Sequence, residues 1–164
     1  MTFFLLFRFL HIASAMWFIG GLVSRQIVRA YAKRTDDVQR FALLFEAAAV
    51  IERTMVIPGG AAVGLFGLIL GLVMGAPILG FLQGAAKNWL LVSVIIILLG
   101  SLPPPLIFLP WRKRLNVLLS DALARGQMTP ELRAEIHNPT VRNAHWLELV
   151  GMGVVLFLMV FRPF

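Results

Sequence analysis

Residues 55–74 read MVIPGGAAVGLFGLILGLVM, a run of 20 positions without a charged side chain. A helix needs about 20 apolar residues to cross the hydrocarbon core of a bilayer, which is about 30 Å thick. Three further stretches have the same character and cover residues 3–23, 89–109 and 146–161. These stretches predict an all-α fold, a transmembrane four-helix bundle.

The composition favours a membrane protein over a soluble one. Hydrophobic residues make up 59% of the 164 residues and charged residues only 14%, and a soluble fold of this size has too little interior to bury so much apolar surface. We expect one membrane domain over residues 1–164, with spans near residues 3–23, 55–76, 88–109 and 145–163. Segments 24–54 and 110–144 carry apolar residues at helical spacing between charges, which predicts amphipathic cytoplasmic helices.

The formal net charge of +7 is spread unevenly along the chain. Six arginines and lysines lie between the first two spans and six between the last two, whereas Lys87 is alone between the second and third. Cytoplasmic connections of membrane proteins carry the excess of such residues. We therefore expect a multi-pass protein of the bacterial inner (plasma) membrane with both termini outside. Topology and attraction to anionic lipids account for the charge, so the expected partner is the lipid bilayer and not nucleic acid.

Glycines recur along the second span at positions 60, 64, 67, 71 and 75. Steps of three and four place these residues on one helix face. Small residues on one face let another helix approach closely, either within the chain or from a second copy or another membrane protein. The alternative is that Gly67 and Gly71 form the floor of a pocket for a flat cofactor.

His11 lies about 12 Å from the outer end of the first span, at about 1.5 Å per residue. An ionisable residue at this depth is a candidate functional residue. It could ligate haem b or a metal ion, or relay protons, or be a neutral histidine bonded to a backbone carbonyl or to a neighbouring helix. Met152 is a candidate second axial ligand. His145 lies roughly 15 Å deeper and is too far away to share a haem with His11.

A second group of polar residues is expected near the inner end of the spans. His145 and Glu148 are three residues apart and share a helix face, and a buried Glu148 would pair with an arginine. Proline breaks at Pro58 and Pro103 lie at the same depth. The group could be an ion-pair lock or the polar site of a small transporter. Its members are Arg25, Glu52, Arg53, His145 and Glu148.

Several short motifs carry a family resemblance. Residues 10–21 read LHIASAMWFIGG, Pro58-Gly59 precedes the glycine-rich span, Trp89 is followed by Ser93, and residues 158–163 read LMVFRP. Together these motifs resemble the family called domain of unknown function 2269, which implies an integral membrane protein of unassigned activity.

The first-helix motif also resembles HemJ-type protoporphyrinogen oxidase, a haem-binding four-helix protein, and the CopD-type membrane domain. The oxidase pattern has a lysine in the third span where Ser93 stands here, so only a ligand role for His11 carries over. Three hypotheses follow for the function. The protein is a haem- or metal-associated redox protein, a non-enzymatic assembly protein, or a small transporter.

Overall fold

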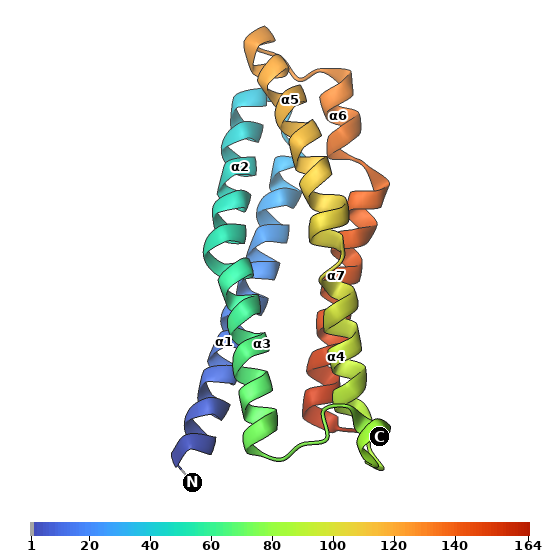
Figure 1. Cartoon of the computed structure of the whole chain (residues 1–164). Coiled ribbons are helices and arrows are strands. Elements are labelled where there is room, and N and C mark those ends of the chain that lie inside the picture. Colours follow the sequence, from blue (N-terminus) through green and yellow to red (C-terminus); the bar gives the residue numbers. More distant parts are fainter. Residues whose placement is uncertain (1) are drawn as a thin grey trace.

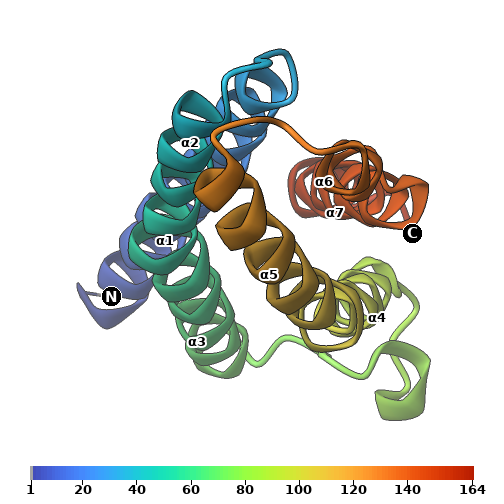
Figure 2. The same ribbon diagram turned by 90° about the horizontal axis from the view of Figure 1, so that it is seen from above.

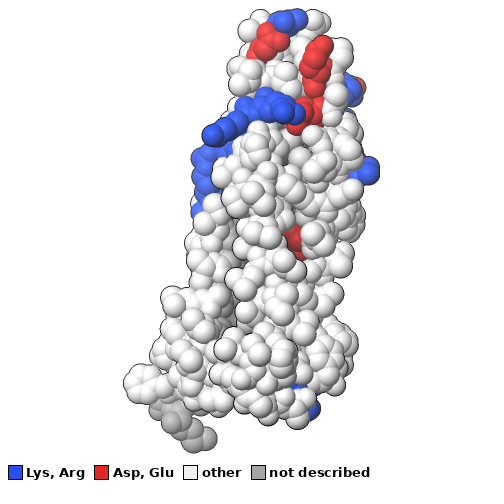
Figure 3. Space-filling view, turned by 45° about the vertical axis from the view of Figure 1, so that its right-hand side comes forward, with Lys and Arg blue, Asp and Glu red and all other residues white. Residues whose placement is uncertain are grey.

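The computed structural model describes residues 2–164 and shows a bundle of helices, with no strand in that range (Figure 1). Four helices are long and apolar enough to cross a membrane: Phe3–Ala32, Val38–Val73, Trp89–Arg125 and Pro130–Phe161. The predicted all-α, four-span bundle is thus confirmed. Both chain ends lie at one end of the bundle, which we call the terminal end. The opposite end, where α5 and α6 lie, carries most of the charge and is called the basic end (Figures 1 and 3).

The first half of the chain folds into two long helices. α1 (Thr2–Ala32) crosses the whole bundle, and α2 (Val38–Ile51) begins at Asp37, whose carboxylate accepts hydrogen bonds from the N–H groups of Gln39 and Arg40. α2 continues through a π-helical turn, η1 (Glu52–Val56), into α3 (Ile57–Val73). Pro58 lies just after this π-helical turn, and because proline has no N–H to donate to the preceding turn, one backbone hydrogen bond is missing where the helix returns from π to α geometry.

The second half is more interrupted. A short 3₁₀ turn, η2 (Gly80–Gln83), leads to α4 (Trp89–Gly100). α4 ends shortly before Pro103-Pro104-Pro105, where the break was predicted. A second π-helical turn, η3 (Pro104–Phe108), starts α5 (Leu109–Arg125), which Gly126 ends at a φ of 68°. α6 (Pro130–Ile136) and α7 (Pro139–Phe161) begin at the side-chain caps Thr129 and Asn138.

Within the bundle, α1 packs most extensively against α3, and α4 packs against α7. Figure 2 shows α1, α2 and α3 together on one side, α6 and α7 on the other, and α5 crossing between them. The residues of α1 that meet α3 and η1 are spaced by three, four or seven: Phe7, His11, Phe18 and Gly21. They contact, in this order, Phe66, Gly67, Gly59 and Met55. We call this contact the α1–α3 seam.

The basic end has an apolar core of its own. Buried side chains from the end of α1 and from α2, α5 and α6 form it: Ala32, Val38, Phe41, Leu115, Leu119, Ala122, Leu132 and Ile136. Below it, large apolar side chains are exposed along most of the bundle, and the surface in Figure 3 is almost free of charge there. A protein in a bilayer needs this arrangement, with an uncharged surface along the spans and the charged residues gathered beyond one end of them.

Candidate functional site

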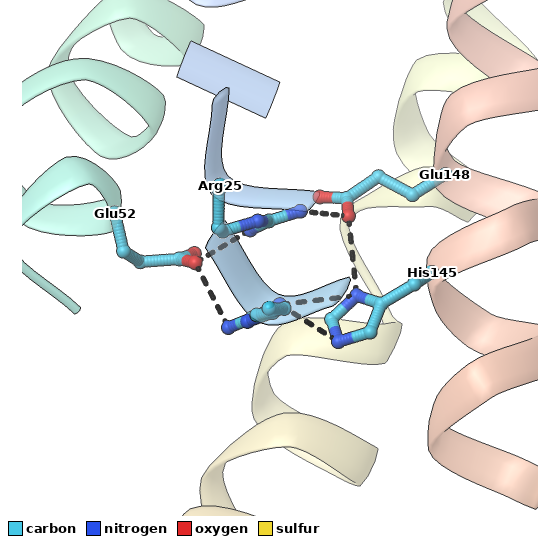
Figure 4. A network of polar contacts seen from close by, with 5 residues as sticks. Arg25, Glu52, His145 and Glu148 are labelled. Atoms are coloured by element: carbon cyan, nitrogen blue, oxygen red, sulfur yellow. Dashed lines mark hydrogen bonds and ion pairs between the residues drawn. The ribbon is translucent and has the colours of Figure 1, made fainter. Parts of the chain in front are cut away.

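The most polar region inside the bundle is a network of five side chains that joins α1, η1 and α7 (Figure 4). Arg25 donates from Nη1 to Oε2 of Glu52 at 2.5 Å and from Nη2 to Oε2 of Glu148. Arg29 donates from Nη1 to Nε2 of His145 at 2.7 Å, and its Nη2 lies 3.5 Å from Oε2 of Glu52. We call these residues the buried ion network.

Local helix geometry explains why these residues meet. Arg25 and Arg29 are one turn apart on α1, and His145 and Glu148 are three residues apart on α7, so each pair shares a face. Glu52 is the first residue of the π-helical turn η1. Two arginines face two glutamates, so the formal charges balance. This balance matters because Arg25 is 0% exposed, and an unpaired charge there would cost several kcal/mol.

The contacts of His145 fix its protonation state. A guanidinium can only donate, so Nε2 of His145 must be the acceptor, and the ring proton of the neutral form is on Nδ1. Nδ1 lies 3.6 Å from Oε2 of Glu148. The ring of Phe108, at the end of η3, stacks on the imidazole with 4.1 Å between ring centroids. The one acceptor nitrogen of neutral His145 is therefore occupied by Arg29 and the other nitrogen carries the proton, so the ring has no lone pair available to a ligand.

The network has more donors than acceptors. Nε of Arg25, Nε of Arg29 and Nε2 of Gln26 are buried and have no hydrogen-bond partner within residues 2–164. Further cations lie just beyond it. Burial lowers the pKa of Lys33, and repulsion from Arg29 and Arg142 lowers it further. The basic end around the network thus holds an excess of positive charge.

The network differs in membership from the group expected from the sequence. Arg25, Glu52, His145 and Glu148 come together, but Arg53 does not, because the next residue along a helix points about 100° away. Its exposed side chain lies 3.5 Å from Glu46 instead. Arg29 was missed, although its position one turn after Arg25 could have indicated it. Nothing in the sequence pattern pointed to Phe108.

His11 lies in the α1–α3 seam and not in the network. Its Nδ1 lies 3.1 Å from the carbonyl oxygen of Val63. In an α-helix the backbone N–H of the residue four positions later bonds to this carbonyl, so the side chain of that residue stands beside it. In α3 that residue is Gly67, which has no side chain. A Cβ placed on Gly67 would lie only 2.8 Å from Cε1 of His11. The missing side chain is therefore what lets the imidazole reach the backbone of α3.

This contact also fixes the proton on His11. A carbonyl can only accept, so Nδ1 donates and the neutral ring keeps a lone pair on Nε2. Nε2 has no hydrogen-bond partner from residues 2–164 and is not among their buried, unpartnered atoms. His11 therefore offers an accessible nitrogen lone pair.

The other predicted cofactor residues lie apart from His11. A Cβ on Gly71 would lie 3.4 Å from Ile78, in the loop after α3, and a Cβ on Gly64 would meet nothing within 4 Å. Met152 is half-buried on α7, in the other helix pair. Among the residues that the structure describes, no three His, Cys, Asp or Glu side chains are grouped to hold a metal ion.

A family model described as "Predicted integral membrane protein (DUF2269)" matches residues 5–163. The chain belongs to this family. No curated protein and no solved structure matches it. The resemblance to the DUF2269 family is thus confirmed, whereas the comparisons do not show the similarity to the HemJ and CopD types. DUF2269 membership establishes an integral membrane protein and leaves its activity to be inferred from the site.

Proposed function

We propose that this DUF2269 protein is a haem-associated redox protein in which His11 supplies an axial ligand to haem b. The observation that carries the proposal is the accessible Nε2 lone pair of His11, left free by the bond from Nδ1 to Val63. Histidine ligands of metals commonly donate their other ring N–H to a backbone carbonyl, which fixes the tautomer and the ring orientation. His11 has this arrangement.

The other two histidines do not offer such a nitrogen at membrane depth. In His145, Nε2 accepts a hydrogen bond from Arg29 and Nδ1 carries the proton of the neutral ring. His137 follows α6 at the basic end, with its Nδ1 2.9 Å from the carbonyl oxygen of Arg133. His11 is thus the one histidine that combines an apolar setting within the first span with an unengaged nitrogen.

The donor set fits haem better than a bare metal ion. A structural or catalytic zinc site takes three or four protein ligands, and in the described part of the chain no three His, Cys, Asp or Glu side chains are arranged so that they could hold a metal ion. Haem supplies four nitrogens of its own and needs only one or two axial ligands. Bound haem would supply one-electron chemistry. The chain would supply the ligand, hold its orientation through Val63 and Gly67, and exclude water.

Haem titration of the purified protein tests the ligand assignment. Haemin added to the detergent-solubilised chain should produce saturable spectral binding in the wild type and in His145→Ala. His11→Ala should lose this binding, because it removes the nitrogen and leaves the fold in place. Equal binding by His11→Ala would show that another group holds the haem.

A second candidate, a small transporter, is favoured by the buried ion network. The network joins the two helix pairs, holds unpartnered buried donors and lies beside two π-helical turns, and π-helical turns often occur at functional sites. Charged residues between interrupted spans are typical of transport pathways. Proton uptake into liposomes under an imposed potential, present in the wild type and lost in Glu148→Gln, would support transport. Liposomes as impermeable to protons as empty ones would contradict it.

The location proposed for the protein is the bacterial inner membrane, with both termini outside. The support is the excess of basic residues at one end of the bundle, opposite both chain ends. Reporter fusions after residue 84, in the loop between α3 and α4, and after residue 126, between α5 and α6, should report opposite sides. Equal signals, or an external signal only at residue 126, would contradict this orientation.

A further inference from the structure

An open cavity of about 340 Å³ lies at the basic end, away from the buried ion network. It is formed where α1 ends and α2 begins, and it is lined by Tyr31, Arg34, Thr35, Asp36, Arg40 and Leu44. Pockets that hold small ligands start at about 300 Å³. The volume therefore suits a compact polar group and not a large planar one.

The side chains around the cavity favour an anion. Arg34 and Arg40 take part in none of the ion pairs found in the described part of the chain, whereas Arg133 engages the carboxylate of Asp36. Oγ of Thr35 accepts the N–H of Asp37 at 3.2 Å, so its hydroxyl proton can be donated elsewhere. Two unpaired guanidinium groups and a free hydroxyl donor match the oxygens of a phosphate group.

Side chains typical of the membrane–water interface lie around the cavity. Leu44 precedes Phe45, whose ring contacts the ring of Trp111 edge-on at a centroid distance of 6.0 Å. Tryptophan and tyrosine gather at the membrane–water interface, and Tyr31 in the cavity wall is 61% exposed. Arg40 precedes Leu44 by one helical turn on α2 and lies farther from the membrane core.

Apolar surface continues from the cavity toward the membrane core. Ile27, one turn before Tyr31 on α1, and Leu43, close to Arg40 on α2, both expose their side chains. An amphipathic ligand could therefore place a phosphate between the arginines and an acyl chain along these residues. Inorganic phosphate would contact the arginines and leave these apolar residues without a partner.

We propose that the cavity between α1 and α2 binds the headgroup of an anionic phospholipid, with Arg34 and Arg40 holding the phosphate. Such a site would anchor the elbow between α1 and α2 to the cytoplasmic leaflet, where anionic lipids attract basic segments. It is independent of haem binding at His11.

Microscale thermophoresis of the full chain in detergent tests this site with three probes: dioleoyl phosphatidylglycerol, dioleoyl phosphatidylcholine and inorganic phosphate. Phosphatidylglycerol should bind at least about 10-fold more tightly than either of the other two. Each arginine near a lipid surface contributes about 5-fold in affinity, so Arg34→Gln with Arg40→Gln should weaken phosphatidylglycerol binding about 30-fold. Arg40→Gln alone should weaken it about 5-fold.

The matched control removes two exposed positive charges from α5 at the same basic end, as Lys113→Gln with Arg114→Gln. This pair should change phosphatidylglycerol binding by less than about 5-fold. Equal losses in the two double variants would mean diffuse attraction and overturn the site. Phosphate binding as tight as lipid binding, with the same loss in the arginine variants, would overturn the lipid as its occupant. All four residues are exposed on the surface, so both double variants should keep the wild-type melting temperature.

Discussion

The α1–α3 seam and the buried ion network each hold a histidine, but the two histidines are bonded in different ways. In the seam, the only polar contact of His11 found in residues 2–164 is to a backbone carbonyl, and one nitrogen is free. In the network, Nε2 of His145 accepts a hydrogen bond from Arg29, Nδ1 lies 3.6 Å from Glu148, and Phe108 stacks on the ring. Depth in the membrane alone therefore does not distinguish the two histidines, whereas the hydrogen-bond partners of their ring nitrogens do.

The two regions also achieve close contact by different means. The seam brings helices together by omitting side chains, since a Cβ added to Gly59 or to Gly67 would lie 3.0 Å or 2.8 Å, respectively, from the nearest atom of α1. The network holds helices by charge, with Arg25 between two glutamates. Substitutions in the network should therefore act mainly on stability, whereas the substitution of His11 should act mainly on ligand binding.

The largest loss of stability is expected for a substitution at the centre of the buried ion network. Arg25→Met leaves the carboxylates of Glu52 and Glu148 half-buried without their shared cation. Breaking a buried ion pair in this way costs about 3–5 kcal/mol. The free energy of unfolding in detergent, measured by denaturant titration followed by circular dichroism, should fall by that amount.

Arg53→Met is the matched control, because Arg53 is the neighbouring arginine on η1 and pairs only with exposed Glu46. It should change the free energy of unfolding by less than about 1 kcal/mol. A combined variant, Arg25→Met with Glu52→Gln and Glu148→Gln, should regain part of the loss. If Arg25→Met and Arg53→Met cost the same, the network does not hold the helix pairs together.

An intermediate effect is expected in the seam. Gly67→Ala would place a Cβ 2.8 Å from the imidazole of His11, and because the ring can rotate aside when it gives up its bond to Val63, the cost should be at the lower end of that for overpacking, about 1 kcal/mol. Gly64→Ala, three residues earlier on the same helix, meets nothing within 4 Å and should leave stability unchanged or raise it by up to about 1 kcal/mol. Thermal unfolding in detergent compares the pair, and equal melting temperatures would show that α1 is not packed against Gly67.

The smallest change in stability is expected for His11→Ala. The carbonyl of Val63 keeps its bond within α3 when the imidazole is removed, so the loss should be about 1 kcal/mol or less. Denaturant titration of this variant beside Arg25→Met makes the comparison direct. A loss as large as that of Arg25→Met would mean that His11 is chiefly a structural residue.

The sequence was sufficient for the spans and for the helix break at Pro103, since each depends on neighbours within about four residues or on the composition of one stretch. It was not sufficient for the contacts between helices. Periodicity shows which residues share a face, but not the rotation of the helix opposite. The meeting of His11 with Gly67, and the place of Arg29 beside His145, depend on that rotation. Gly60 and Gly64 share one predicted face, yet only Gly60 contacts α1.

The visible spectrum of the protein purified from cells supplied with ample haem tests the central claim most directly. We expect a Soret band, with reduced-minus-oxidised maxima of a b-type haem. The band should persist in His145→Ala, because the imidazole of His145 bonds within the network and offers no lone pair to haem. It should disappear in His11→Ala, which should remain folded. A colourless wild-type protein, or a band that survives in His11→Ala, would contradict the assignment of His11 as a haem ligand.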